Sequence, residues 1–251
     1  MRASALAFCG KRLFSTSPLE LKSQFRALLR ESAQPVAVVT TKTHSASSPS
    51  PSHSGSHSQY HGATLSSFTS IAMDPHPLIA FSLRLPSRMA TYLSEVKAEK
   101  RHSDSSESTE TEAQLVINIL SAAQEPLAVV FSRPDLHPRP FSSSVEYELN
   151  RDGIPVLNGS LGAISCRLVT PPIPLHNLGS LRKGLEPGSI LREQQMENEA
   201  DVVDGVTSEL FIARVVDVQL SGEEEGHEER MPLLYHRRGY TTCRLDYNGK
   251  K

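Results

Sequence analysis

The chain has 251 residues, of which 38% are hydrophobic and 22% charged, and its formal net charge is −2 at pH 7. This length can bury one large core, so we expect a single domain with long loops. The lack of a basic excess argues against nucleic-acid binding, and no apolar run approaches the ~20 residues that a membrane-spanning helix needs. Cys9, Cys166 and Cys243 lie far apart, which indicates a reducing compartment rather than a disulfide framework.

Residues 1–17 have the composition of an imported targeting segment. They contain Arg2, Lys11 and Arg12 among serines and alanines, and the first acidic residue of the chain is Glu20. The apolar centre of a secretory signal would be longer and less interrupted. We therefore expect a mitochondrial transit peptide and a location in the matrix. The alternative is a disordered tail on a cytoplasmic protein.

The segment after this tail predicts a helix and then a core strand. Ser17, Pro18 and Glu20 form a capping box with proline at the first helical position. Apolar side chains at helical spacing predict an amphipathic helix over 18–32. Its apolar face consists of Leu21, Phe25, Leu28 and Leu29. The β-branched run at 36–41, VAVVTT, predicts a buried strand.

Two insertions, residues 44–58 and 97–113, are rich in serine and in charged or polar side chains. They offer too little apolar surface to offset the entropy of ordering them, so we expect long disordered loops. His53, His57 and His61 recur every four residues at the first insertion. Because no acidic neighbours or rigid frame accompany them, we interpret this spacing as loop expansion and predict no metal site.

Residues 61–70, HGATLSSFTS, predict a strand that carries hydroxyl side chains where a buried strand would carry apolar ones. The hydroxyl residues are Thr64, Ser66, Ser67, Thr69 and Ser70. Because alternate residues face opposite sides of a strand, hydroxyls on both faces need partners. A planar heteroaromatic ligand would supply such partners, and so would water at an exposed edge.

A helix start follows the next predicted strand, 77–84. The segment 86–96, PSRMATYLSEV, predicts a helix with Ser87 as its N-cap. Free amide groups, the hydroxyls of Ser87 and Thr91 and the guanidinium of Arg88 favour a bound phosphate there. Taken alone, this segment is more simply a helix cap. Beside the hydroxyl-rich strand, it predicts a ligand with a flat ring and a phosphate.

The remainder of the chain predicts further strands at 115–120, 145–149, 161–170 and 208–220, a short helix at 124–131 and a final strand at 232–242. With the earlier segments, this gives about seven strands and two or three short helices. Short strands at this spacing favour a mainly β fold, an antiparallel barrel.

Six segments in this order resemble the flavin reductase-like family, the FMN-binding split barrels, over most of residues 20–245. They are FRALLRESAQPVAVVTT, HGATLSSFTSIAMDPHPLIAFSL, PSRMATYL, LVINILSAAQEPLAVVF, VLNGSLGAISCRL and MPLLYHRRGYTT. The long insertions resemble those of embellished fungal members. The resemblance implies a split β-barrel domain over 18–248 with FMN, or FAD in its place, held at a homodimer interface.

The family pattern also implies the residues of the site. The flavin would be lined by Thr64, Ser66, Ser67 and Phe68, by the backbone of Ser82 and Leu83, and by the amide of Asn118. Its phosphate would be held by Ser87, Arg88 and Thr91. The implied activity is hydride transfer from NAD(P)H to flavin N5, which needs no catalytic side chain. The suggested partner is a flavin-dependent monooxygenase.

One departure from the family keeps other functions open. Many members carry Gly-Asp-His before the penultimate strand, whereas the matching stretch here, residues 206–212, has no histidine. The first alternative is a flavin-binding or haem-binding barrel without reductase turnover. The second is an interaction scaffold with a vestigial pocket.

Overall fold

The computed structural model describes residues 17–43, 60–65, 67–99, 112–142, 145–176, 207–220 and 230–243. The predicted transit peptide except Ser17, the whole first insertion and most of the second lie outside these ranges, and so does Ser66. Within them, no helix has both the length and the apolar character that crossing a bilayer requires.

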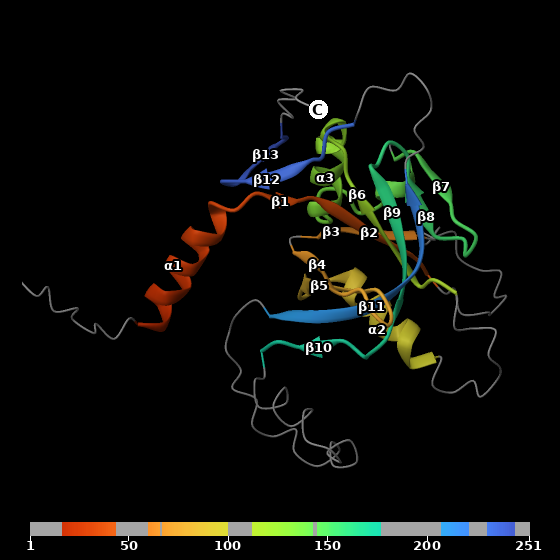
Figure 1. Cartoon of the computed structure of the whole chain (residues 1–251), viewed down its shortest axis with the longest axis horizontal. Coiled ribbons are helices and arrows are strands. Elements are labelled where there is room, and N and C mark those ends of the chain that lie inside the picture. The colour runs from red at the N-terminus through yellow and green to blue at the C-terminus, as the bar shows by residue number, and fades with distance from the viewer. Residues whose placement is uncertain are drawn as a thin grey trace, which may run out of the picture.

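Most of the described strands belong to one curled antiparallel sheet (Figure 1). Its path is β3-β2-β6-β9-β11-β5-β4, and β10 pairs with β11. The strands are β2 (Ala37–Lys42), β3 (Tyr60–Leu65), β4 (Phe68–Ala72), β5 (Leu78–Arg84), β6 (Leu115–Ile119), β9 (Gly162–Leu168), β10 (Ile173–Pro174) and β11 (Ser208–Leu220). The predicted mainly β, antiparallel split barrel is confirmed.

The hydroxyl-rich segment is two strands rather than the single strand predicted over 61–70. β3 and β4 stand at opposite ends of the sheet path, although they follow each other in the chain. Leu65 pairs with Ala37 of β2, whereas Phe68 pairs with Phe81 of β5. The chain therefore passes from one sheet edge to the other at this point. We call the side of the barrel where the chain enters β4 the seam.

Two small sheets and three α-helices complete the described fold. The first sheet joins β1 (Gln34–Pro35), β12 (Leu234–His236) and β13 (Gly239–Thr241), and the second joins β7 (Tyr147–Leu149) and β8 (Pro155–Leu157). The helices are α1 (Pro18–Arg30), α2 (Arg88–Glu99) and α3 (Glu125–Ser132), with single 3₁₀ turns at Ala122–Gln124 and Pro140–Ser142. The three predicted helices are confirmed, and α2 extends into the predicted second insertion.

The C-terminal segment forms a hairpin and not the single strand predicted over 232–242. Arg237 and Arg238 have positive φ values of 48° and 68° and connect β12 to β13. Two consecutive positive φ values give the tight turn that matches the twist of paired strands. The sequence hides this turn because arginine replaces the glycine or asparagine that usually marks it.

The core has two apolar layers, one on each face of the curled sheet. Inside the barrel, Val39 of β2 and Ile117 of β6 pack with Phe81, and the opening is covered by Leu93 of α2. On the outer face, Val38 packs under Phe131 of α3. Because β2 is covered on both faces, its apolar residues run continuously instead of alternating.

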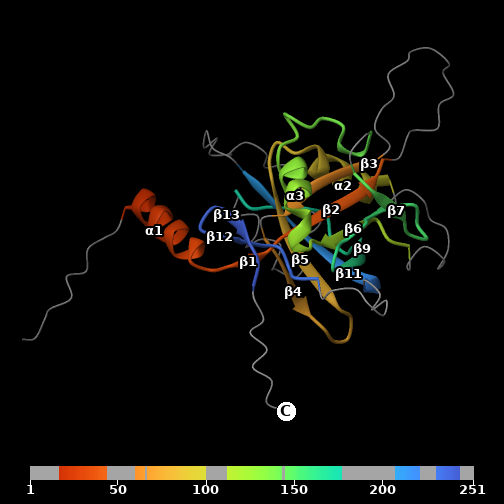
Figure 2. The same cartoon turned by 90° about the horizontal axis from the view of Figure 1, so that it is seen from above.

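α1 lies outside both layers and projects from the barrel (Figure 2). The side chain of Ser17 accepts a hydrogen bond from the Glu20 amide at 3.2 Å, which confirms the predicted N-cap. No residue of this helix is buried. The apolar face that the sequence predicts therefore has no cover within the described chain.

Candidate functional site

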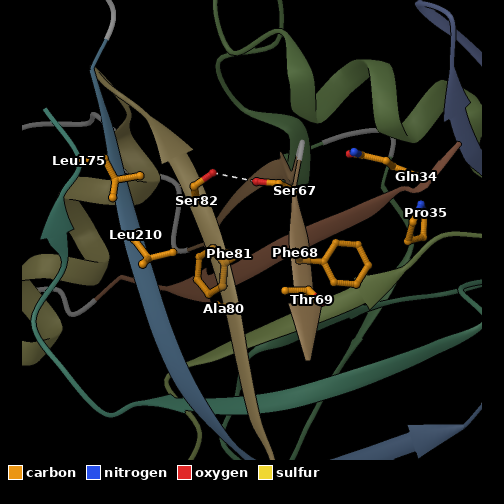
Figure 3. A pocket seen from close by; sticks show the side chains of 10 residues that line it. All are labelled: Gln34, Pro35, Ser67, Phe68, Thr69, Ala80, Phe81, Ser82, Leu175 and Leu210. Atoms are coloured by element: carbon orange, nitrogen blue, oxygen red, sulfur yellow. Dashed lines mark hydrogen bonds between the residues drawn. The ribbon is translucent and has the colours of Figure 1, made fainter. Parts of the chain in front are cut away.

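An open pocket of about 430 Å³ lies at the seam of the barrel (Figure 3). Its walls come from β4, β5, β11 and the short strand β1. The lining residues are Gln34, Pro35, Ser67, Phe68, Thr69, Ala80, Phe81, Ser82, Leu175 and Leu210. This volume falls within the roughly 300–1,000 Å³ that is usual for small-molecule sites.

The polar rim of the pocket is a pair of serine hydroxyls. The Oγ atoms of Ser67 and Ser82 lie 2.8 Å apart, and Figure 3 shows them facing each other across β4 and β5. The Ser82 amide also donates to the Ser67 carbonyl at 3.4 Å. A hydroxyl has one donor and two acceptor positions. The pair can therefore keep its mutual hydrogen bond and still bond a ligand.

The floor of the pocket is apolar and includes Ala80. Phe81 lies behind it: its ring is buried in the barrel core and stacked on Phe211, with centroids 5.2 Å apart and an angle of 6° between the planes, on the opposite face of β5 from Ser82. Leu210 and Leu175 extend this floor, and Phe68 reaches from β4 toward Pro35 on the other side (Figure 3). A flat apolar floor beside a hydroxyl rim suits a planar heteroaromatic ring.

The residues predicted to bind the phosphate lie at the start of α2, which follows the pocket strand β5 in the sequence. Ser87 caps the helix, because its Oγ accepts the Ala90 amide at 3.3 Å and its carbonyl accepts the Thr91 amide at 3.1 Å. Arg88 and Thr91 are exposed. None of the three lines the pocket. Ser87 follows Ser82 by five positions along the chain, which is about 17 Å at full extension.

The guanidinium of Arg88 donates from Nη1 to the Pro138 carbonyl at 3.4 Å. A guanidinium has five N–H donors, so this bond uses one of them. The side chain is therefore held near the helix start with donors left for an anion. This geometry fits a phosphate beside α2, as the sequence predicts, and the assignment of that role stays a prediction.

Three other predicted residues have partners inside the fold. Thr64 donates to the Ala128 carbonyl at 2.8 Å and so faces α3. Leu83 is buried in the barrel core. Asn118 is fully buried: its amide nitrogen donates to the Val38 carbonyl, and its oxygen accepts the Leu157 amide at 2.8 Å. These contacts give all three a place in the framework rather than in the pocket lining.

Of the ten predicted residues, the pocket brings together Ser67, Phe68 and Ser82. Sequence reasoning missed most of the apolar lining, in particular Leu175 and Leu210. Leu210 pairs with Ser82 across β11 and β5, so a correct strand pairing would have identified it. That pairing joins segments far apart in the chain, and the residue pattern carries no signal for it.

A second polar feature lies where β3 meets α2. The His61 ring is stacked on Tyr92 at 4.0 Å, and its Nε2 atom is buried without a partner in the described structure. Burial, and then the charge of Arg88, lower the pKa of His61 to about 4. His61 is therefore neutral near pH 7 and ties the barrel wall to the helix.

The family model described as "Flavin reductase like domain" matches residues 29–244. The chain belongs to the flavin reductase-like family. The resemblance seen in the six sequence segments is thereby confirmed for nearly the whole domain.

One curated protein resembles part of this sequence. FMN reductase (NADH) SmoA of Agrobacterium fabrum is 33% identical over 106 residues, which are 42% of this chain and 49% of that protein. The match thus spans about half the length of the curated relative.

Two solved structures share the fold over most of both chains. The NADH:FAD oxidoreductase SgcE6 of Streptomyces globisporus, in complex with NAD and FAD fragments, has a TM-score of 0.55 and 17% identity and covers 90% of this chain and 95% of that one. Nitrilotriacetate monooxygenase component B of Mycobacterium thermoresistibile has a TM-score of 0.55 and 18% identity, with 92% and 90% covered. At such identities the likeness shows the fold.

Proposed function

We propose that this chain binds a flavin, FMN or FAD, in the seam pocket and catalyses its reduction by NAD(P)H. The observation that carries the proposal is the serine pair beside an apolar floor in one open pocket, in a member of the flavin reductase-like family. The curated relative is named an FMN reductase that uses NADH. Because the match covers about half of that protein, it supports flavin reduction as the class of activity.

Different residues would hold the ring and the phosphate of the flavin. The hydroxyls of Ser67 and Ser82 would bond the polar edge of the ring, and Leu175 with Leu210 would support its apolar face. Arg88 and the free amides at the start of α2 hold the phosphate. The bound flavin supplies the redox chemistry as a hydride acceptor, while the protein supplies position and electrostatics.

No lining residue of the pocket titrates near neutral pH. A hydride transfer between two bound cofactors requires that the protein align them and exclude water, and it requires no general base. The stretch 207–212, which lacks the family histidine, enters β11 beside β5. The proposal therefore does not depend on a histidine at that position.

An anaerobic titration tests the activity. Purified protein loaded with FMN or FAD is mixed with NADH, and separately with NADPH, while the visible flavin absorbance is followed. We expect the absorbance to bleach with at least one nicotinamide, faster than for the same flavin free in solution. Tight flavin binding without any bleaching would favour the alternative of a binding protein without turnover, for which the absent histidine is the argument.

We also propose that the protein is a homodimer that passes reduced flavin to a flavin-dependent monooxygenase. The pocket is open, with Ser67 and Thr69 exposed, so a second subunit would shield the flavin from water. The structural neighbour from M. thermoresistibile is a monooxygenase component B, which supports a two-component system. Sedimentation velocity of the flavin-loaded protein tests the dimer.

The mitochondrial matrix is our proposal for the location, and it is supported by the composition of residues 1–17 alone. A fluorescent protein fused after residue 17 should enter isolated mitochondria and be shortened there. Replacing Arg2, Lys11 and Arg12 with glutamate should stop its import. Import of both forms, or of neither, would contradict the proposal.

A further inference from the structure

Gln34 brings an amide group to the wall of the seam pocket. Its side chain is partly buried and lines the pocket from β1, and Figure 3 shows the amide extending from that strand toward the side of the pocket formed by β4. No described residue is hydrogen-bonded to this amide. A primary amide has two N–H donors and a carbonyl acceptor. Gln34 therefore offers both kinds of hydrogen bond to a ligand in the pocket.

The backbone on either side of Gln34 is fixed by the C-terminal hairpin. Gln34 pairs with Tyr235 of β12, and the next residue, Pro35, has a restricted φ angle. Beyond Pro35, the Val36 amide donates to the Leu233 carbonyl at 3.0 Å. The main chain that carries the amide thus needs no reordering when a ligand enters, which keeps the entropic cost of binding low.

The proposed reaction brings two ring systems into this pocket, and each has polar groups. The polar edge of the flavin is assigned to the hydroxyls of Ser67 and Ser82, which reach the pocket from the side of β4 and β5. The nicotinamide ring carries a carboxamide, whose donors and acceptor match those of a glutamine side chain. Among the lining residues, only Gln34 has an amide side chain, and none is charged. Two amides can pair through two hydrogen bonds, with each group donating once and accepting once.

We infer that the side-chain amide of Gln34 binds the carboxamide of the nicotinamide and so selects the ring that donates the hydride. The inference rests on the proposed function, because it assigns one side chain to the co-substrate of that reaction. A ring held by its carboxamide has a fixed orientation beside the flavin, and hydride transfer depends on such alignment. A co-substrate without the carboxamide leaves one of these hydrogen bonds unmade and binds more weakly.

Equilibrium binding to the FMN-loaded protein tests this contact without turnover. Isothermal titration calorimetry compares NAD⁺ with 3-acetylpyridine adenine dinucleotide, in which a methyl ketone replaces the carboxamide and removes its N–H donors. We expect the unmodified chain to bind NAD⁺ about 5-fold more tightly, since the analogue loses one hydrogen bond. This preference should disappear in Gln34→Leu, because leucine bonds neither group.

A second variant separates recognition from a structural effect. The carboxylate of Gln34→Glu accepts from the carboxamide N–H and repels the ketone oxygen, so this variant should keep a preference for NAD⁺ of about 5-fold or more. A structural role alone predicts the same preference in the leucine and glutamate variants. The matched control is Gln24→Leu, which removes an exposed amide of α1 that bonds Glu20, and it should bind both dinucleotides like the unmodified chain.

The affinity for FMN, measured by quenching of flavin fluorescence, should be the same in Gln34→Leu and in the unmodified chain. Weaker FMN binding with an unchanged preference between the dinucleotides would assign Gln34 to the flavin and overturn the inference. Failure to bind NAD⁺, or equal preferences in the leucine and glutamate variants, would also overturn it. Bleaching by NADH is measured separately, so a failure of the reductase proposal can be distinguished from a failure of this contact.

Discussion

Asn118 illustrates how a buried polar side chain differs from a ligand-binding one. Its side chain joins three strands: it bonds the Val38 carbonyl and the Thr40 hydroxyl of β2 and accepts the Leu157 amide of β8. Without the side-chain amide, the Leu157 amide and the Val38 carbonyl would each lose a buried hydrogen bond, whereas the Thr40 hydroxyl would still donate to the Pro155 carbonyl. A sequence shows only an asparagine in an apolar strand, which fits a ligand contact equally well.

Asn118→Ala should therefore lower the free energy of unfolding by about 2–4 kcal/mol, since two buried backbone groups would each lose a hydrogen bond. Urea unfolding measures the change. Ser94→Ala is the control, because Ser94 donates to the Ala90 carbonyl one turn earlier in its own helix α2. Equal stability of the two variants would contradict the framework role of Asn118.

Because burial lowers the pKa of His61, the stability of the fold should depend on pH. Its pKa is about 4 in the folded protein and about 6.5 in an unfolded chain. Between these values the unfolded state binds the extra proton, so stability is full above pH 6.5 and falls as the pH drops toward 4. His61→Phe keeps a ring against Tyr92 and removes the titration.

The loss of stability between pH 7 and pH 5 should be smaller in His61→Phe than in the unmodified chain. Urea unfolding at both pH values measures this difference, and the NMR titration of the His61 ring gives its pKa directly. The same pH dependence in both proteins, or a His61 pKa near 6.5, would contradict the burial of this ring.

Among the secondary-structure elements, α3 depends on one glycine of β3 for its position. A Cβ atom built on Gly62 would lie 2.3 Å from Cε1 of Phe131, whose ring is buried in the outer core layer. Any larger residue must displace the Phe131 ring, which packs α3 against the sheet. The nearby bond from Thr64 to Ala128 would then be strained as well.

Gly62→Ala should thus destabilise the fold by about 1–3 kcal/mol, which is typical of overpacking in a dense core. Gly239→Ala is the control, because a Cβ there would meet only the His236 carbonyl at 3.8 Å. Thermal unfolding followed by circular dichroism compares the two. A Gly62→Ala protein as stable as the control would show that α3 can shift without cost.

The elements themselves were largely predictable, since local signals mark them. Ser17 and Pro18 start α1, and β11 spans the predicted 208–220. The division of 61–70 was not predictable, because Leu65 and Phe68 belong to strands at opposite sheet edges. Strand order depends on pairing between distant segments, and a local pattern does not contain that information.

For the whole molecule, the seam of the barrel explains why the site could be predicted only in part. Ser67 was predictable because hydroxyls in a predicted strand need partners, whereas Ser82 came from the family resemblance, which implied a contact through its backbone. Leu175 and Leu210 reach the pocket only after the sheet has curled and β10 has paired with β11. Gln34 and Pro35 arrive through β1, a strand too short to predict. The polar rim of the pocket could thus be predicted from the sequence in part, and its apolar floor could not.

The affinity for FMN, measured by quenching of flavin fluorescence, tests most directly whether the seam pocket holds the flavin. Ser67→Ala with Ser82→Ala removes both rim hydroxyls and should weaken binding about 10-fold or more, since each bond contributes about 1 kcal/mol. Ser132→Ala, on the exposed side of α3, should bind FMN like the unmodified chain. Equal affinities in all three proteins would contradict the assignment of the pocket.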